Sequence, residues 1–283
     1  MLFRRLVLGA LLVGVLAGVF LSVVQRWQVV PLIAAAERYE VAAEVATAPV
    51  AVPPHGAAGH DHALHHASAS AAAPTDPVTA AGHDHAAAEW QPADGLERSA
   101  FTALANVLTA SGFALLLLAA MAGVEVWRGH VPVAARHGLL WGAAGYLSFY
   151  VAPALGLPPE IPGAQSAGLA ARQLWWLVAV GCTAGALALF AFGRSPWRWG
   201  VGLLLLALPP LLGAPHAGLP FAEHPPAVAA ELSVIAAQFF VATAIANGLY
   251  WLVLGSLAAW AFRRWLSALA AAPDAPCGAS ATR

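Results

Sequence analysis

The sequence contains no lysine, and all 13 of its basic residues are arginine. A P-loop ends in a lysine that contacts the nucleotide phosphates, so the absence of lysine excludes this class of ATPase. Charged residues of either sign make up only 10% of the 283 residues, and the formal net charge is −1. Because a nucleic-acid-binding surface needs a basic patch, we expect no nucleic acid among the partners of this protein.

Cysteine is almost as scarce as charge. The two cysteines, Cys182 and Cys277, lie far apart in the sequence. They match neither the spacing of a zinc site nor a disulfide framework, so we interpret them as thiols of packing or tail segments. No catalytic or cofactor-binding motif accompanies them, and we expect neither an enzyme nor a protein with a resident cofactor.

Hydrophobic residues, by contrast, make up 60% of the chain, and the mean hydropathy is +0.71. Soluble domains are about half apolar and about a quarter charged, so much of this surface must face something other than water. A helix crosses the hydrocarbon core of a lipid bilayer with about 20 mainly apolar residues. We therefore predict an all-α, polytopic membrane protein built as a six-helix transmembrane bundle. The uncharged intervals of the sequence place these helices at residues 5–25, 99–124, 137–155, 173–193, 198–213 and 237–262.

Two of the six segments allow another interpretation. The first follows Arg4 and Arg5 as a signal peptide would, but its apolar run is longer than the about 7–15 residues of such a peptide. We therefore expect it to be retained as a helix. The fifth is interrupted by Pro209 and Pro210, so a re-entrant segment is the alternative to a full crossing.

The arginines predict how the bundle is oriented, because loops on the cytoplasmic side carry an excess of basic residues. With the N-terminus inside, nine arginines are cytoplasmic and four are external. The inner set is Arg4, Arg5, Arg128, Arg136, Arg194, Arg198, Arg263, Arg264 and Arg283, and the outer set is Arg26, Arg38, Arg98 and Arg172. This pattern predicts a multi-pass protein of a bacterial inner (plasma) membrane with both termini in the cytoplasm. The chain then divides into a first transmembrane helix (1–25), an external loop (26–98), transmembrane helices two to six (99–262) and a cytoplasmic tail (263–283).

The external loop is rich in histidine. Its middle, residues 46–88, is dominated by Ala, Pro, Gly, Ser and His, a composition that predicts disorder. The heptapeptide AAGHDHA occurs in it twice, as Ala57 to Ala63 and Ala80 to Ala86. Two histidines separated by one residue lie on the same side of an extended backbone, and a neutral imidazole is the commonest metal ligand. Expansion of a low-complexity tract without a function is the alternative. The candidate metal ligands are His60, Asp61, His62, His65, His66, His83, Asp84 and His85.

A second external segment carries further candidate ligands. His216, Glu223 and His224 lie between the fifth and sixth predicted helices, in a stretch framed by prolines. Proline-broken segments at membrane depth free backbone carbonyls that can line a substrate path, and they occur here at 153–162 and 209–210. Ligands of these types suit borderline divalent ions such as cobalt, nickel, zinc and copper. We therefore predict a second metal-binding station at this segment.

Small and polar residues inside the predicted helices indicate how the helices pack. Small residues recur every four positions on the first, third and fourth helices, which allows close approach of neighbouring helices. They are Ala10, Gly14, Gly18, Ser22, Gly138, Gly142, Gly181 and Gly185. Asn106, Gln173, Gln238 and Asn247 predict hydrogen bonds between helices. His137 and Glu125 lie at the inner ends of their helices, and we expect water to reach Glu125.

Four stretches of the sequence form an ordered pattern: WQPADGLER (90–98), FTALANVLTASGFALLL (101–117), GLLWGAAGYLSFYVAPALGLPPEIPG (138–163) and RQLWW (172–176). Together they resemble the CbtA family of predicted cobalt transporter subunits. The resemblance implies cobalt uptake for cobalamin synthesis together with a small, histidine-bearing membrane subunit of the CbtB type. It also implies five transmembrane helices, whereas the arginine pattern favours six.

The predicted function is that of a membrane permease subunit for uptake of a divalent transition metal, with cobalt favoured. The histidine-rich loop would capture the ion outside the bilayer. A membrane-anchored, non-transporting metal sensor or chaperone is one alternative. A membrane enzyme or haem protein that uses His137 is another, although a second axial ligand is not evident near any predicted helix.

Overall fold

The computed structural model describes residues 2–47, 92–93, 95–128 and 135–266, which are almost entirely helical and contain no strand. The all-α prediction is therefore confirmed for this part of the chain. The loop ligands His60, Asp61, His62, His65, His66, His83, Asp84 and His85 lie outside the described residues. The elements are α1 (Leu2–Gln28), α2 (Val30–Thr47), α3 (Leu96–Arg128), α4 (Ala135–Tyr146), the π-helix η1 (Leu147–Val151), α5 (Ala152–Ala154), α6 (Leu169–Phe192), α7 (Arg198–Leu212), α8 (Pro226–Ala261) and the π-helix η2 (Phe262–Leu266).

Four helical segments of the described chain are long and apolar enough to cross a membrane. They are Phe3–Gln28, Leu96–Arg128, Leu169–Phe192 and Pro226–Leu266. The other two predicted crossings are also helical, but α4, η1 and α5 form one interrupted segment and α7 has only 15 residues. The chain is therefore an all-helical membrane protein, and six crossings remain a prediction.

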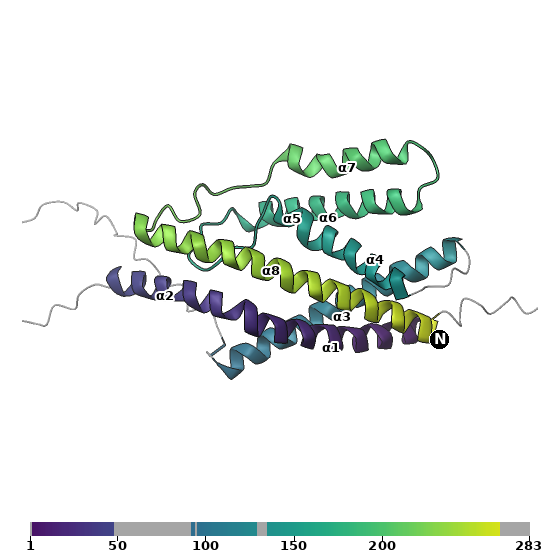
Figure 1. Ribbon diagram of the computed structural model, residues 1–283, viewed down its shortest axis with the longest axis horizontal. Helices are drawn as coiled ribbons and strands as arrows, with labels where there is room; N and C mark the ends of the chain where they lie inside the picture. Colours follow the sequence, from purple (N-terminus) through teal and green to yellow (C-terminus); the bar gives the residue numbers. More distant parts are fainter. Residues whose placement is uncertain (1, 48–91, 94, 129–134, 267–283) are drawn as a thin grey trace, which may run out of the picture.

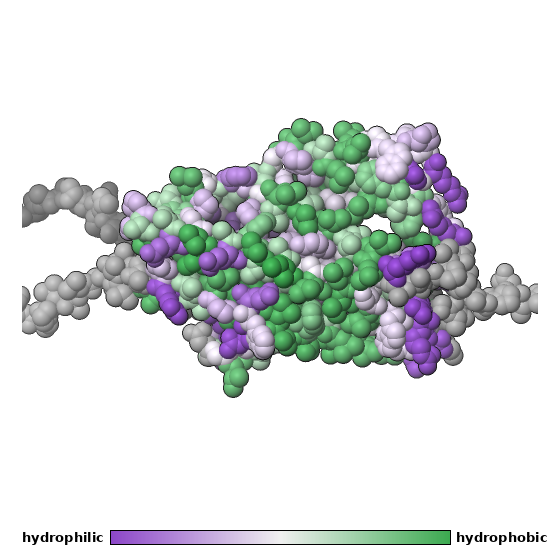
Figure 2. Space-filling model, in the orientation of Figure 1, coloured by the Kyte–Doolittle hydropathy of each residue, from purple (hydrophilic) through white to green (hydrophobic). Residues whose placement is uncertain are grey.

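The six segments run up and down along a common axis, as Figure 1 shows. The start of α1 and the end of α8 lie at one end of the bundle, where Arg5 Nη1 donates a hydrogen bond to the Trp265 carbonyl at 3.4 Å. At the same end, Arg128 of α3 donates to the Phe192 carbonyl of α6 at 3.1 Å. Hydrophilic residues gather at both ends, with an apolar band between them (Figure 2). Consecutive segments run in opposite directions, so the helix ends that carry the predicted cytoplasmic arginines lie at the same end of the bundle.

Helices α1 and α3 approach each other closely through the small residues predicted from the sequence. A Cβ atom added at Gly14 would lie 2.4 Å from the Ser111 Cα, and one at Gly18 would lie 2.5 Å from the Val107 Cα. Asn106 of α3 donates hydrogen bonds to Gln25 Oε1 at 2.7 Å and to Ser22 Oγ at 3.0 Å. The predicted interhelical hydrogen bond of Asn106 is therefore confirmed.

Small residues also allow a close approach of α4 to α8, but those of α6 do not bring its backbone close to a neighbouring helix. A Cβ atom at Gly142 would lie 2.3 Å from the Trp251 carbonyl oxygen, and one at Gly138 would lie 2.8 Å from the Ala259 Cβ. A Cβ atom added at Gly181, in contrast, would have no atom of a neighbouring helix of the described chain within 4 Å. A Cβ atom added at Gly185 would lie 3.6 Å from the Leu205 Cδ1 atom of α7. At this position α7 therefore contacts α6 through a side chain rather than through its backbone. The predicted close backbone approach on α6 is therefore wrong within the described chain.

Three other predicted interhelical hydrogen bonds are not seen among the described contacts. Asn247 donates instead to the Thr243 carbonyl of its own helix at 2.9 Å. Gln173 and Gln238 have exposed side chains on α6 and α8. A helical asparagine can reach the carbonyl one turn earlier, so it need not find a partner on another helix.

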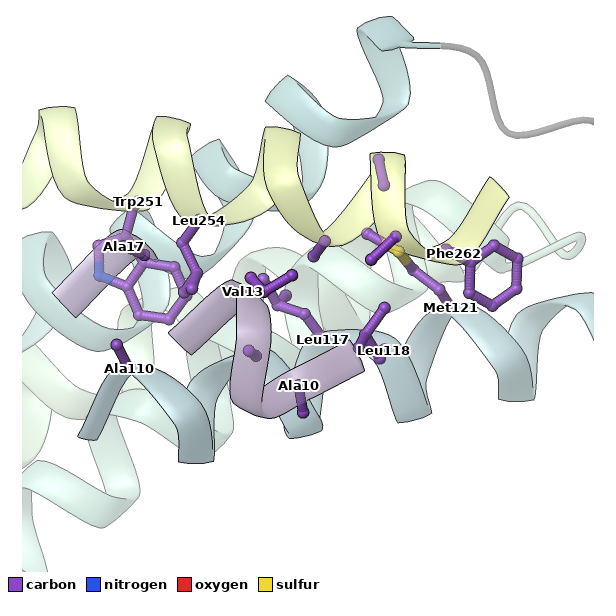
Figure 3. Packing of buried hydrophobic residues seen from close by; sticks show 14 of the residues in the cluster. Ala10, Val13, Ala17, Ala110, Leu117, Leu118, Met121, Trp251, Leu254 and Phe262 are labelled. Carbon is purple, nitrogen blue, oxygen red and sulfur yellow. The ribbon is translucent and has the colours of Figure 1, made fainter. Parts of the chain in front are cut away.

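Two apolar clusters hold the bundle together. The first joins α1, α3 and α8 and includes Val13, Leu118 and Leu254, each with no exposed surface (Figure 3). The second lies nearer the end of the bundle that is opposite to the N-terminus. It buries Ile161, Phe221 and residues of α2 and α8 against one another. Ile161 and Phe221 belong to the two irregular segments, 155–168 and 213–225, so this cluster holds both segments on the helices.

Candidate functional site

A cavity of about 460 Å³ lies between α3, α4 and α6. Its wall is mainly apolar, with side chains such as Leu117, Leu187 and Phe192. Four residues with polar side chains also line it: Glu125, Arg128, His137 and Ser148. A carboxylate, an imidazole and a hydroxyl group therefore line the wall of one cavity between the helices.

Glu125 is buried, with only 6% of its surface exposed. It lines the cavity, and access of water to it at the inner end of its helix stays a prediction. Helix α3 continues beyond it to Arg128, whose guanidinium donates a hydrogen bond to the Phe192 carbonyl of α6. The position of Glu125 is unusual because ionisable residues within transmembrane segments are rare and mark functional sites.

Ser148 reaches the cavity from the π-helical turn η1. The backbone N–H of Ala152 bonds to the Leu147 carbonyl five residues earlier, which defines a π-type widening of the helix. Pro153 follows directly and has no N–H to offer the carbonyl four residues before it. Ser148 itself is 3% exposed. The proline-broken segment predicted from the sequence, 153–162, begins four residues after Phe149, the last residue of this stretch that lines the cavity.

Aromatic rings of η1 and its flank attach this segment to α8. The rings of Tyr146 and Tyr150 stack with centroids 5.5 Å apart. The Tyr146 hydroxyl donates to the Ala244 carbonyl at 3.0 Å, and the Tyr150 hydroxyl lies 2.9 Å from Thr243 Oγ1. These hydrogen bonds hold the π-turn on α8, so Ser148 and Phe149 face the cavity from a supported position.

Arginines and aromatic rings lie at the end of the cavity near Arg128 and Arg194, here called the arginine-bearing end. The Arg128 guanidinium lies 5.1 Å from the Phe192 ring centroid and donates a hydrogen bond to the backbone carbonyl of the same residue. Arg194 lies 5.8 Å from the Trp127 ring. Cation–π contacts and hydrogen bonds of this kind hold Arg128 against α6. This end of the cavity therefore carries positive charge.

The predicted external station lies at the opposite end, between α7 and α8. His216 is exposed, and its Nδ1 donates to the Ala214 carbonyl at 2.5 Å. Glu223 is also exposed. His224 is half-buried, and its Nε2 donates to the Gly163 carbonyl at 3.3 Å. Within residues 2–47, 92–93, 95–128 and 135–266, no three His, Cys, Asp or Glu side chains are grouped closely enough to hold a metal ion. A joint role of these three residues therefore stays a prediction.

One acidic side chain of α2, that of Glu40, lies near His224, which the sequence did not indicate. A Cβ atom at Gly163 would lie 3.3 Å from His224 Nε2 and 3.7 Å from Glu40 Cγ, so both side chains flank this glycine. Tyr39 donates a hydrogen bond to the Glu231 carboxylate, and this bond raises the pKa of the Tyr39 hydroxyl. The repeated acidic residues of the ERYE stretch, 37–40, were the available signal.

Two of the four predicted external arginines form ion pairs with carboxylates. Arg172 Nη2 lies 3.0 Å from Glu160 Oε2, and Arg98 Nη1 lies 3.2 Å from Glu37 Oε2. Both pairs are partly exposed, so each contributes little to stability. They partly neutralise the positive charge at this end of the bundle.

An all-helical bundle with membrane-length apolar helices, in which a buried carboxylate and a half-buried imidazole line one cavity, is a polytopic membrane protein with ionisable groups among its helices. Residues 3–263 match the family model CbtA, described as "Probable cobalt transporter subunit". The chain therefore belongs to the CbtA family, and the resemblance seen in four stretches extends over most of its length. No curated protein and no solved structure matches the chain.

Proposed function

We propose that this protein is the membrane permease subunit for uptake of a divalent transition metal, with cobalt as the favoured ion. The match of residues 3–263 to a family of cobalt transporter subunits carries this proposal. A cavity with metal-ligating side chains inside the bundle is consistent with a path for the ion. The sequence has no P-loop, so the energy would come from a partner, an ion gradient or the gradient of the metal itself.

The proposed direction of transport is from the histidine-rich side to the arginine-bearing side. Helix α2 and the start of α3 lie at the end of the bundle opposite to the N-terminus (Figure 1). The segment between them contains seven histidines. With both termini cytoplasmic in a bacterial inner membrane, this segment would lie outside and capture the ion before it enters the bundle.

A partner subunit is part of the proposal because the family is described as a transporter subunit. The partner would be a small membrane protein of the CbtB type that also bears histidine. The bundle offers it wide apolar surfaces, since residues such as Leu104, Leu177 and Leu203 are exposed on the outer faces of their helices.

Deletion of residues 55–85 should raise the cobalt concentration needed for half-maximal uptake on the order of tenfold and leave the maximal rate largely intact. The reason is that this segment would raise the local metal concentration rather than form the pathway. The measurement is accumulation of radiolabelled Co²⁺ in cells, with Ni²⁺ and Zn²⁺ as competitors. A glycine–serine segment of equal length in place of residues 55–85 is the matched control for loop length.

Two other outcomes of the uptake experiment would change the proposal. Complete loss of uptake on deletion would make the segment part of the pathway itself. Equal cobalt accumulation with and without the intact chain would overturn the transport proposal and favour a non-transporting metal sensor or chaperone. An absorption spectrum of the purified protein tests the haem alternative directly.

Substitution of His216 and His224 together by alanine should slow cobalt uptake about two- to tenfold without reducing cobalt binding by the histidine-rich segment. The two imidazoles would pass the ion from the captured pool to the bundle. Initial uptake rates and equilibrium binding to the purified chain measure the two effects separately. Ser233→Ala, at an exposed position near the start of α8, serves as the control. An unchanged uptake rate in the double variant would reject the external station.

A further inference from the structure

We propose that the cavity between α3, α4 and α6 is a binding site for one anionic phospholipid of the surrounding membrane. One acyl chain would lie along the apolar wall of the cavity. The guanidinium groups of Arg128 and Arg194 would bind the phosphate of the lipid headgroup. This site goes beyond the proposed function, because it does not depend on which ion the protein transports.

Two arginines converge on one aromatic ring at the arginine-bearing end. Arg128, the last residue of α3, lies 5.5 Å from the Trp127 ring centroid, and Arg194, which follows α6, lies 5.8 Å from the same centroid. Both arginines are exposed, and within the described residues neither forms an ion pair with a carboxylate. A guanidinium has five N–H donors, of which Arg128 uses one on the Phe192 carbonyl, and its planar shape matches a phosphate group. The two side chains therefore form a place where an anion can bind.

The cavity is open on one side. Two leucines of its wall, Leu116 of α3 and Leu140 of α4, are 50% and 64% exposed, and Ala188 of α6 is exposed as well. Figure 2 shows a hollow between α6 and the helices below it, near the hydrophilic residues of this end. Because α3 and α6 are long enough to cross a membrane, the open side at this depth would face hydrocarbon. An acyl chain can then enter the cavity without leaving an apolar environment.

The length of the cavity matches one leaflet of a bilayer. On α3 its lining runs from Leu116 to Arg128, which corresponds to about 18 Å at about 1.5 Å per residue. The hydrocarbon core of a bilayer is about 30 Å thick, so one leaflet contributes about 15 Å. An acyl chain whose headgroup lies at the arginines would therefore end near the middle of the membrane, still within the cavity. The volume of about 460 Å³ is also in the range of ligand sites, about 300–1,000 Å³.

A transmembrane helix of a partner protein fits the cavity less well than a lipid. A helix is about 10 Å wide, so a length of about 18 Å has a volume of about 1,400 Å³, which is about three times that of the cavity. Positive charge at one end of an apolar cavity instead matches the two parts of an anionic phospholipid. Basic pockets between transmembrane helices on the cytoplasmic side bind such headgroups, and the arginine-bearing end is the predicted cytoplasmic end.

Glu125 and His137 also line the cavity, and neither of them is without an interaction partner. Glu125 precedes Arg128 by nearly one helical turn. A phosphate bound by Arg128 and Arg194 would therefore lie closer to the membrane surface than the Glu125 carboxylate. The acyl chain would cover the open side of the cavity and separate these polar side chains from the surrounding membrane.

The test is a lipid titration of the detergent-purified full-length protein, followed by native mass spectrometry. The probe is phosphatidylglycerol, and phosphatidylcholine with the same acyl chains is the reference without net charge. We expect the protein to bind phosphatidylglycerol on the order of tenfold more tightly, because each arginine near an anionic headgroup adds to the attraction. Equal affinities for the two lipids would overturn the site.

Replacement of both arginines, by Arg128→Gln together with Arg194→Gln, should reduce this preference to about twofold or less. Arg38→Gln is the matched control, since Arg38 is an exposed arginine of α2 at the opposite end of the bundle. An unchanged preference in the double variant would contradict the assignment of the headgroup site. Inorganic phosphate, compared with chloride at equal ionic strength, should not displace the lipid. Displacement by phosphate alone would indicate a site for soluble anions and would reject the lipid site.

A variant of the cavity wall keeps the test decisive if the double arginine variant does not fold. Ala188→Phe adds a ring to the wall, so both lipids should bind less tightly while both arginines remain. Ala119→Phe makes the same change at an exposed position of α3 that does not line the cavity, and it should leave lipid binding unchanged. Equal lipid affinities for Ala188→Phe and Ala119→Phe would show that no acyl chain occupies the cavity.

Discussion

A cysteine placed at Ser166 should react with a membrane-impermeant maleimide in intact cells, whereas a cysteine at Ser195 should react only after the membrane is permeabilised. Ser166 lies in the segment between α5 and α6, and Ser195 lies between α6 and α7. If α4–α5 crosses the bilayer, Ser166 lies outside and Ser195, beyond α6, lies inside, whether or not α7 crosses. Alkaline phosphatase fused near His62 should likewise be active outside. The expected effect is close to all-or-none, and gel-shift labelling of each variant measures it.

The native cysteines, Cys182 and Cys277, are replaced by alanine before either cysteine is introduced. This cysteine-free chain is the background and the negative control. If only the four long helices cross, α4–α5 and α7 stay on the side where they begin. Ser166→Cys would then be protected and Ser195→Cys labelled, the reverse of the expected pattern. That result would contradict six crossings.

Gly142→Leu should prevent α4 from packing on α8 and should abolish the folded, monodisperse form of the protein. A Cβ atom at this position would lie 2.3 Å from the Trp251 carbonyl oxygen and 3.2 Å from the Leu252 Cα. Overpacking of a core costs about 1–3 kcal/mol, and more where backbone rather than a side chain must move. Thermal unfolding of the detergent-purified protein, followed by size-exclusion chromatography, measures the loss.

Gly181→Leu is the matched control for this substitution. It introduces the same side chain into another apolar helix, at a glycine with no described atom within 4 Å of an added Cβ. Its unfolding temperature should stay within a few degrees of that of the unmodified protein. Equal unfolding temperatures for Gly142→Leu and Gly181→Leu would show that the close contact of α4 with α8 does not stabilise the bundle.

The large effect expected at Gly142 follows from the environment of the helices. Lipid tails are as apolar as the helix surfaces, so little hydrophobic free energy is gained when two helices associate in a bilayer. Close van der Waals packing between backbones supplies much of the stabilisation instead. Gly138, Gly142 and Gly255 allow this approach between α4 and α8, as Gly14 and Gly18 do between α1 and α3.

The positions of the helices could be predicted from the sequence because charge is so scarce in this chain. Every predicted crossing coincides with a helical segment. The helix ends could not be predicted as well. Helix α8 begins at Pro226, well before the predicted residue 237, because Glu231 ended the uncharged interval. Uncharged intervals report the part of a helix that fits the hydrocarbon core, whereas a helix can extend beyond the bilayer surface.

The candidate sites were predicted less completely than the helices. His216, Glu223 and His224 stand out in the sequence because they are polar residues among prolines, but their exposure and backbone contacts became visible only in the fold. Glu40 was overlooked because nothing local indicates that α2 reaches the Gly163 segment. Gly181 and Gly185 show the same small-residue spacing as Gly138 and Gly142 but meet no neighbouring backbone. Such spacing permits a close approach and does not choose a partner.

The sequence by itself determined that this chain is an all-helical membrane protein, where its apolar helices lie and which family it belongs to, because these properties depend on local composition and on motifs along the chain. Tertiary structure alone decided that Glu125 is buried and that it shares a cavity with His137 and Ser148. These residues come from different helical segments, and the distances between helices depend on how side chains fit rather than on sequence spacing. The cavity and its lining could therefore be found only after α3, α4 and α6 had been placed together.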